Sequence, residues 1–402
     1  MARRLLDAGS HVSPFRNRSD RLIIDGKPLA DDHFSGVGHY TMSLVGALDE
    51  VLVDRPDLDV RIVVPRDRTA RVHEMGLRRI RPLRLPVPYL AFRRAVEQGT
   101  LPTMDRLLGR GTYFFPNYIR WPLHRSPSVT AVHDLSFVKV PETVDGPNAQ
   151  LLRREVRNSV EHSDAITALT ETMADEIAEH YDLPRGRIHV VGAASDQRHF
   201  YRRSDREIAE VKATYGIYGD YLITVGNIEP RKNQIRLIDA FCSLPRALAD
   251  RYTLILVGAG AWNERAIHAR VDEALASGHK VMALLSTVSD RDLPALYSGA
   301  SASTYTSIYE GFGMPPLEAM ACQTPVLTGD RSTMPEVAGG AAILVDVTDT
   351  DAIAKGLEGI LGLDDGARAD LVARGLENVD RYRWETAAQH LLGAVDAVAV
   401  SR

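Results

Sequence analysis

Hydrophobic and polar residues follow a repeating order along the chain, in which short apolar runs alternate with longer amphipathic segments. The short runs are rich in β-branched residues and indicate buried strands, whereas the segments between them have the apolar period of helices. This order continues from Arg21 to Val345 without an internal repeat or a low-complexity tract. Alternating strands and helices are typical of parallel sheets built from βαβ units.

Six strands are expected in each half of the chain. In the first half they are Arg21–Asp25, Val60–Val64, Thr112–Phe115, Val129–His133, Ala165–Ala168 and His189–Val191. In the second half they are Tyr221–Val225, Thr253–Val257, Val281–Leu285, Ala302–Tyr305, Pro325–Leu327 and Ala342–Val345. Helices are expected over Tyr40–Leu52, Asn148–Glu161, Glu171–Glu179, Gln234–Ser243, Glu264–Ala276, Asp290–Ser298 and Pro316–Met320.

The number of strands is larger than one mononucleotide-binding unit contains. We therefore expect two facing, Rossmann-like, doubly wound α/β domains. The break falls near Tyr215–Asp220, a short segment rich in turn residues, which gives domains at 21–214 and 215–383 after an N-terminal extension at 1–20. The tail beyond Asp365 is helical without a strand. Ligands of such folds bind beyond the carboxyl ends of the strands, so the catalytic groups should lie just after strands, in the interdomain cleft.

Composition is typical of an ordinary globular protein. The 402 residues are 45% apolar and 25% charged, which excludes a disordered protein, a coiled coil and a collagen-like fibre. The two cysteines, Cys242 and Cys322, supply neither a disulfide framework nor a zinc cluster, which favours a reducing compartment. No apolar run approaches the length of a membrane span and the N-terminus has no signal-peptide core, so we expect a cytoplasmic protein.

Charge is distributed unevenly. Residues 1–212 carry 32 Lys and Arg against 29 Asp and Glu, a net charge of +3, whereas residues 213–402 carry 16 against 24, a net charge of -8. Residues 78–110 alone hold eight arginines against Glu97 and Asp105, with apolar residues between them. This segment is a candidate for peripheral contact with anionic lipid at the inner face of a membrane, or with a phosphate-bearing substrate; a solvated arginine face is the alternative.

Three segments that follow strands contain candidate binding residues. Gly36 and Gly38 open a helix, where the first free backbone N–H groups can receive an anion. His133 ends a strand and can donate a hydrogen bond or act as a base near neutral pH. Arg231 and Lys232 lie at a strand-to-helix turn, where they can clamp a diphosphate. Taken singly, each feature is also typical of a structural turn, a buried histidine or a solvated basic pair.

A fourth segment, from Ser307 to Met320, has two acids joined by a glycine-bracketed loop and two prolines that suit a helix start. Glu310 precedes the helix and can accept hydrogen bonds from ligand hydroxyls. The backbone N–H groups around Phe312–Leu317 can bind phosphate. Glu318 can accept from a vicinal diol such as ribose. A nucleoside diphosphate sugar has these features in that order, although two unrelated surface acids would give the same pattern.

Together, and in this order, the segments resemble family 4 of the retaining glycosyltransferases, which have the GT-B fold. The resemblance extends from Leu22 to about Arg383. It rests on Ser35–Tyr40, His133–Phe137 with Pro141-Glu142, Glu229–Asn233, Glu310–Ala319, Thr324-Pro-Val and Pro335–Gly339.

The resemblance implies a role for each matching residue. Glu310 would contact hydroxyls of the donor sugar and Glu318 the ribose. Arg231 and Lys232 would neutralise the departing diphosphate, and His133 would lie at the reacting face. The donor site would be completed by Gly36, Gly38, Thr287, Val288, Gly311, Phe312, Gly313, Met314, Pro315 and Leu317, with the base on the backbone of Thr287 and Val288.

The resemblance also implies how the domains divide the work. The N-terminal domain would bind a glycan, glycolipid or other hydroxyl acceptor, the C-terminal domain would bind the nucleotide sugar, and a helix over 384–402 would cross back to the N-terminal domain. Neither a metal ion nor a bound cofactor is implied, and no nucleic-acid partner is expected. The Pro-Arg-Lys-Asn sequence at 230–233 resembles that of mannosyltransferases and other hexosyltransferases of surface polysaccharide assembly, which favours GDP-mannose first and a UDP-hexose second.

The chain departs from the family pattern at two positions of the donor site. Asn227 stands where many members have arginine, and Ser286 stands where glycine is usual before the base-binding backbone. Three other functions remain as alternatives: a nucleotide-sugar epimerase, a non-catalytic nucleotide-sugar-binding protein and a nicotinamide dehydrogenase. The last is disfavoured because the sequences that begin at Gly36 and Gly258 both lack the third glycine of the dinucleotide fingerprint.

Overall fold

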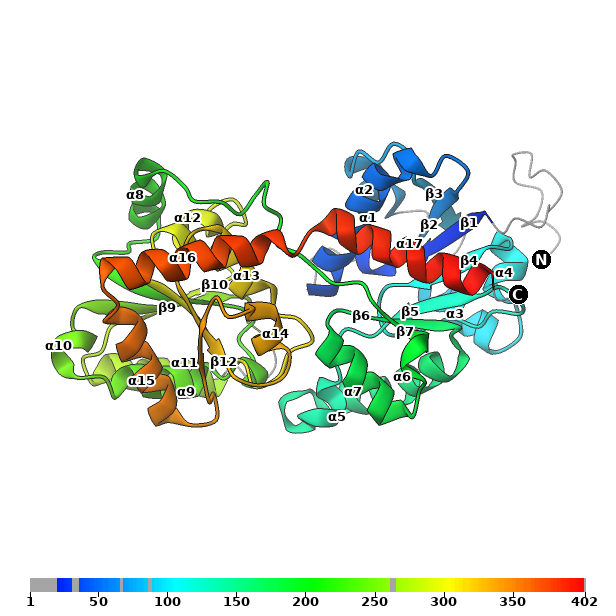
Figure 1. Cartoon of the computed structure of the whole chain (residues 1–402). Coiled ribbons are helices and arrows are strands. Elements are labelled where there is room, and N and C mark those ends of the chain that lie inside the picture. Colours follow the sequence, from blue (N-terminus) through cyan, green and yellow to red (C-terminus); the bar gives the residue numbers. More distant parts are fainter. Residues whose placement is uncertain (1–19, 31–35, 66–67, 86–88, 261–264, 401–402) are drawn as a thin grey trace.

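The computed structural model describes residues 20–30, 36–65, 68–85, 89–260 and 265–400. Its strands form two parallel sheets with the orders β3-β2-β1-β4-β5-β6-β7 and β10-β9-β8-β11-β12-β13. Each sheet and its helices form one lobe, and the first and second lobes lie side by side (Figure 1). The prediction of two parallel α/β units is confirmed.

The strands of each sheet are short, and those inside the sheets are largely buried. The first sheet contains β1 (Arg21–Asp25), β2 (Asp59–Pro65), β3 (Arg81–Leu85), β4 (Thr112–Phe115), β5 (Ser128–Ala131), β6 (Ala165–Ala168) and β7 (Ile188–Val190). The second contains β8 (Asp220–Val225), β9 (Tyr252–Gly258), β10 (Val281–Leu285), β11 (Ala302–Tyr305), β12 (Val326–Gly329) and β13 (Ile343–Val345). Leu22, Ile23 and Ile24 of β1 are all fully buried, as expected for a parallel strand covered by helices on both faces.

Helices connect most successive strands. The first sheet is accompanied by α1 (Gly36–Val51), α2 (Thr69–Glu74), α3 (Tyr89–Glu97), α4 (Met104–Leu108), α5 (Ser136–Lys139), α6 (Gly146–His162) and α7 (Glu171–Tyr181). They are followed by α8 (Asp205–Thr214), α9 (Gln234–Cys242), α10 (Arg246–Ala249), α11 (Arg265–Ala276), α12 (Leu293–Ser298), α13 (Met314–Ala321), α14 (Met334–Ala338) and α15 (Thr350–Leu361). Helix α8 contacts α12 and lies beside the second lobe (Figure 1).

The two C-terminal helices run across both lobes (orange to red in Figure 1). Helix α16 (Asp365–Asp380) packs on α13 of the second lobe, whereas α17 (Trp384–Val400) packs on α1 and on strands of the first sheet. Leu391 of α17 is fully buried, and Asp396 accepts hydrogen bonds of 3.0 and 3.4 Å from Arg55. The tail therefore connects the second lobe to the first.

Among the described strands, β3 is the one that the sequence analysis does not predict. It pairs in parallel with β2 and forms the edge of the first sheet. Arg81 and Arg84 of β3 are exposed and Pro82 interrupts the apolar pattern, which is the usual composition of an edge strand. The segment predicted as an arginine-rich surface therefore contains structured strand and helix.

Several apolar residues of the arginine-rich segment face inward. Leu85, Phe92 and Tyr89 belong to a core cluster that also contains Trp121. Arg93 forms ion pairs with Glu97 and Glu155, so part of the positive charge is neutralised. Residues 86–88 lie outside the described residues, as do residues 1–19 of the predicted extension. A membrane contact here would use arginine charge rather than insertion of these buried rings and chains.

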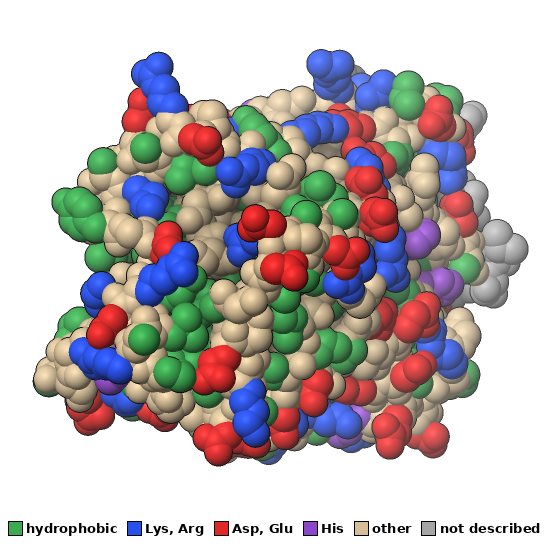
Figure 2. Space-filling model, turned by 60° about the vertical axis from the view of Figure 1, so that its left-hand side comes forward, with side chains coloured by type: hydrophobic (Ala, Val, Ile, Leu, Met, Phe, Trp, Pro, Cys, Tyr) green, Lys and Arg blue, Asp and Glu red, His purple; other side chains and the backbone are tan. Residues whose placement is uncertain are grey.

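The surface of the second lobe has no single-sign patch on the face that Figure 2 brings forward, where acidic and basic side chains are interspersed. Among the described residues, no helix combines the length and apolarity needed to cross a bilayer.

Candidate active site between the lobes

The loops that follow β5, β8 and β11 meet where the two lobes touch. We define the Glu310 loop as residues 306–313, between β11 and α13. A Cβ atom on Gly311 would overlap the carbonyl oxygen of His133, so the Glu310 loop presses directly on the backbone of the first lobe. Glycine is required here by this close approach.

The turn after β8 places Arg231 and Lys232 at the carboxyl end of the second sheet. Residues Pro230–Lys232 form one short 3-10 turn, and Asn233 ends it in the left-handed conformation with φ of 59°. Asparagine tolerates this region better than most residues. Its side-chain amide donates to Val347 O at 2.7 Å, which anchors the turn to the loop that follows β13.

Arg231 and Lys232 both bind the carboxylate of Glu310. A guanidinium nitrogen of Arg231 lies 2.7 Å from Oε2, and Nζ of Lys232 lies 2.6 Å from Oε1. The Glu310 side chain is only 9% exposed. The structure thus brings together three residues that the sequence analysis assigned to one donor site.

Two hydroxyl groups complete the environment of Glu310. Tyr305 and Ser307 donate to Oε1 at 2.9 and 2.6 Å. Burial alone would raise the pKa of Glu310, but the two cations outweigh it and hold the pKa well below its ordinary value of 4.5. The carboxylate of Glu310 is therefore ionised at neutral pH. Burial lowers the pKa of Lys232, whereas the negative charge of Glu310 acts in the opposite direction.

Glu229 adds a second acid beside Arg231. Its Oε1 accepts from the guanidinium at 2.8 Å, so two cations face two carboxylates. We refer to Glu229, Arg231, Lys232, Tyr305, Ser307 and Glu310 as the Glu310 cluster. Its contacts fix both basic side chains at the strand ends, which is the preorganisation that electrostatic stabilisation of a leaving anion requires.

His133 lies two residues beyond β5 and is buried. Its Nε2 is 2.6 Å from Pro116 O, and because a carbonyl only accepts, Nε2 must carry a proton. Burial lowers the pKa of the imidazole and thus favours its neutral form. In that form, with the proton on Nε2, Nδ1 is the ring nitrogen that can accept a hydrogen bond. The rings of Tyr40 and Tyr118 contact it edge to face at centroid distances of 4.9 and 5.3 Å.

Gly36 and Gly38 lie in the first turn of α1, which begins four residues earlier than the sequence pattern indicates. Tyr40 follows them on the same helix and contacts His133, so the start of α1 lies beside His133. Ser35, the first residue of that motif, lies outside the described residues.

The start of α13 is partly suited to binding an anion. Gly313 occupies the N-cap with φ of 88°, and no side chain caps the helix. Pro315 and Pro316 have no N–H, so the donors of this segment are confined to Phe312, Gly313, Met314 and Leu317. The side chain of Leu317 is fully buried, which leaves its backbone as the part able to bind a ligand.

Glu318 lies one turn into α13 and accepts from the Tyr297 hydroxyl at 3.1 Å. Burial raises the pKa of Glu318 to about 7. The two glutamates of the motif therefore differ in protonation, because Glu310 has cationic partners and Glu318 has a neutral one.

The predicted base-binding backbone follows β10. Ser286 adopts the left-handed conformation, φ of 53°, that a glycine would reach without cost, so this departure from the family pattern preserves the turn. Thr287 is exposed and Val288 half-buried. The Tyr215 hydroxyl donates to Asp292 at 2.9 Å and accepts from the Ser289 N–H at 3.3 Å, which fixes the residues next to this backbone.

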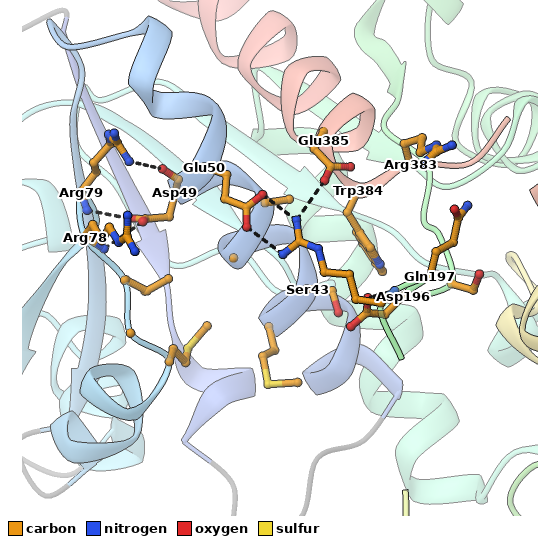
Figure 3. A pocket seen from close by; sticks show the side chains of 18 of the residues that line it. Ser43, Asp49, Glu50, Arg78, Arg79, Asp196, Gln197, Arg383, Trp384 and Glu385 are labelled. Atoms are coloured by element: carbon orange, nitrogen blue, oxygen red, sulfur yellow. Dashed lines mark hydrogen bonds and ion pairs between the residues drawn. The ribbon is translucent and has the colours of Figure 1, made fainter. Parts of the chain in front are cut away.

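A cavity of about 730 Å³ lies between α1, residues 75–79, residues 195–198 and the α16–α17 junction (Figure 3). None of the predicted site residues lines it. Arg198 pairs with both carboxylate oxygens of Glu50 at 3.0 Å, and Asp49 accepts the backbone N–H groups of Arg78 and Arg79. These charges are therefore paired within the protein.

Sequence reasoning did not assign Tyr305, Ser307, Glu229 or Tyr297 to the site. Tyr305 is the last residue of β11, so the rule that ligands bind beyond strand ends would have identified it. Tyr297 gave no such signal, because it lies within α12 and reaches Glu318 only through tertiary packing. Among the described residues, no group of three or more His, Cys, Asp or Glu is arranged to hold a metal ion.

Comparison with known proteins decides the family. Family models described as Glycosyltransferase Family 4 and Glycosyl transferases group 1 match residues 34–196 and 210–377. O-antigen chain mannosyltransferase B of Escherichia coli is 31% identical over 283 residues, which cover 70% of this chain and 73% of the relative. The chain is a family 4 glycosyltransferase. A D-inositol 3-phosphate glycosyltransferase of Salinispora tropica is 32% identical over 305 residues, covering 70% of this glycosyltransferase and 61% of the relative.

A further relative is much longer. The serotype-specific mannosyltransferase WbdA of Escherichia coli is 28% identical over 263 residues, which cover 65% of this glycosyltransferase but only 32% of WbdA. The glycosyltransferase thus matches about a third of the length of WbdA.

Solved structures confirm the GT-B fold of this glycosyltransferase. Sucrose-phosphate synthase from Thermosynechococcus elongatus superposes with a TM-score of 0.71 at 18% identity, covering 95% of this chain and 100% of the other. Anabaena HepE in complex with UDP and glucose gives 0.70 at 15% identity, covering 94% and 99%. The predicted pair of facing Rossmann-like domains is confirmed.

Proposed function

We propose that this glycosyltransferase moves mannose from GDP-mannose to a hydroxyl group of a growing glycan or lipid-linked saccharide, with retention at the anomeric carbon. The observation that carries the proposal is the Glu310 cluster, which sets two cations at strand ends against the His133 edge of the first lobe. The choice of mannose is supported by the O-antigen chain mannosyltransferase at 31% identity.

In the proposed reaction the bond between the anomeric carbon and the diphosphate breaks through an oxocarbenium-like state. Negative charge develops on the departing phosphate, where Arg231, Lys232 and the N–H groups before α13 would stabilise it. The acceptor oxygen forms the new glycosidic bond and its proton passes to the departing phosphate, so GDP leaves. No metal ion and no bound cofactor is part of this proposal.

Glu310 is poorly suited to act as a covalent nucleophile. Its carboxylate contacts two cations and two hydroxyl groups, and these contacts withdraw electron density from its oxygens. This environment supports attack by the acceptor from the face that the diphosphate leaves. In this scheme Glu310 orients the two cations and accepts from hydroxyls of the donor sugar.

A UDP-hexose is the second candidate donor. Family membership favours transfer over the epimerase, dehydrogenase and non-catalytic alternatives, because the relatives named above are transferases. We also propose a cytoplasmic protein with acceptor bound by the first lobe. The exposed Arg81 and Arg84 would give that lobe an electrostatic contact with anionic lipid.

Thermal denaturation in the presence of GDP, UDP and ADP tests the nucleotide, and turnover with GDP-mannose tests the sugar. We expect GDP to raise the melting temperature most and GDP-mannose to be consumed with release of GDP. NMR of the product, showing the same anomeric configuration as the donor, would establish retention. Stabilisation by UDP alone would move the proposal to a UDP-hexose, and stabilisation by no nucleotide would contradict it.

A further inference from the structure

Tyr309 crosses from the second lobe into the first. Its side chain is buried in a core cluster that otherwise consists of first-lobe residues, among them Leu135 and Phe137. The hydroxyl donates to Glu176 Oε2 at 2.5 Å and accepts from the Leu135 N–H at 3.3 Å. Glu176 lies on α7, so the residue just before Glu310 is held by that helix.

Glu336 makes a second contact with the same helix. Its Oε1 accepts from the Glu171 N–H at 2.8 Å, and its Oε2 accepts from the N–H and hydroxyl of Thr172 at 2.8 and 2.6 Å. Thr170 caps the next N–H, that of Met173, from within the first lobe. The first turn of α7 is therefore satisfied by both lobes, and the negative carboxylate lies at the positive end of the helix dipole.

The Glu336 contact is linked to the backbone of Glu310 through the residues that precede α14. Ser332 Oγ donates to Glu310 O at 2.7 Å and accepts from its N–H at 3.1 Å. Thr333 Oγ1 also donates to Glu310 O, at 3.0 Å. Both sides of the Glu310 loop thus connect to α7, one through Tyr309 and the other through Glu336.

We propose that Tyr309 and Glu336 are positioning residues, which dock the Glu310 loop on α7 and so set the donor-side cluster against His133 for transfer. Neither side chain belongs to the Glu310 cluster. Loss of the docking should therefore slow the transfer step while leaving nucleotide binding, which uses mainly second-lobe residues, nearly unchanged. The inference rests on the proposed transfer reaction.

The test uses the full chain with Glu336→Ala, Tyr309→Phe and the double variant. The control is Glu377→Gln, which changes an exposed glutamate of α16 in the same lobe. Three quantities are measured: hydrogen exchange of the amides of Glu171 and Thr172, affinity for GDP by calorimetry, and turnover of saturating GDP-mannose. Circular dichroism and the melting temperature establish that each variant is folded.

We expect exchange of the two amides to be at least tenfold faster in Glu336→Ala than in wild type, and turnover of the double variant to fall at least tenfold. GDP affinity should stay within twofold of wild type, and the control should match wild type throughout. Unchanged turnover in a folded double variant, unchanged exchange, or an equal loss of GDP affinity and turnover would overturn the proposal. Exchange needs no donor, so a wild-type protein inactive on GDP-mannose would contradict the proposed function while the exchange result still decides whether the docking exists.

Discussion

Lys232 and Glu310 form a buried ion pair in which Nζ lies 2.6 Å from Oε1. Arg231 binds the other carboxylate oxygen at 2.7 Å. Removal of one partner from such a pair leaves the other charge buried and unsatisfied. The basic turn and the Glu310 loop, separated by 78 residues in sequence, therefore act as one unit.

Lys232→Ala should reduce turnover at saturating donor by a hundred- to a thousandfold. The variant removes one preorganised cation that faces the developing phosphate charge, and loss of one such group costs about 3–4 kcal/mol. Steady-state kinetics with GDP-mannose checks this. Lys355→Ala is the control, because Lys355 is exposed on α15 of the same lobe. A Lys232→Ala enzyme that retained most of its turnover would refute the clamp.

Glu310→Gln should lower turnover about ten- to a hundredfold, since a charge-assisted hydrogen bond contributes about 1.5–3 kcal/mol. GDP affinity should not weaken, because Arg231 and Lys232 lose a competing anion when the carboxylate becomes an amide. Calorimetry with GDP and kinetics with GDP-mannose separate the two effects. If turnover stayed at the wild-type level, or GDP binding weakened more than tenfold, the role assigned to Glu310 would be wrong.

The sequence predicted most of the strands because buried parallel strands are uniformly apolar, as in Leu22–Ile24 of β1. It did not predict β3, where Arg81, Pro82 and Arg84 remove the apolar run. The exposed side of this edge strand carries arginine, so the pattern of β3 does not report burial. Local pattern thus identified the strands inside the sheets and failed at an edge.

The sequence identified individual residues of the site but not how their side chains are arranged. Motifs identified Arg231 and Glu310 because each follows a strand, but no local pattern shows that their side chains meet. The contact of Gly311 with the His133 backbone joins two lobes and depends on how the whole chain folds. The neutral state of His133 likewise follows from its burial, and its bond to Pro116 O sets which ring nitrogen carries the proton; a sequence specifies neither.

Gly311→Ala should abolish most transfer while preserving nucleotide binding. The added methyl group would overlap His133 O, and because that atom belongs to the backbone, the Glu310 loop must move away from the first lobe. We expect turnover to fall at least a hundredfold and GDP affinity to change less than threefold.

Gly359→Ala is the matched control for Gly311→Ala. Gly359 lies within α15, a Cβ there meets nothing within 4 Å, and alanine favours a helix by about 1 kcal/mol. This variant should be fully active and no less stable than wild type. Normal turnover in Gly311→Ala would show that the contact of the Glu310 loop with His133 is not needed for transfer.

Glu318 should make donor binding depend on pH. Burial raises its pKa to about 7, above the ordinary value of 4.5, so the folded protein binds this proton more tightly than the unfolded chain. The residue therefore lowers stability as pH rises from about 4.5 to about 7, and has no further effect above that range. If the ionised carboxylate accepts from the ribose diol, affinity for the donor should rise with pH through about 7 and then level off.

GDP-mannose is the appropriate probe for this prediction, because its diphosphate, substituted at both ends, does not titrate near neutral pH as the terminal phosphate of GDP does. At pH 6 about a tenth of a carboxyl with a pKa near 7 is ionised, so affinity should be roughly tenfold weaker than at pH 8. Glu318→Gln should remove the pH dependence and bind with similar affinity at both values. A wild-type affinity that is constant from pH 6 to pH 8, or a dependence that survives in Glu318→Gln, would show that another group recognises the ribose.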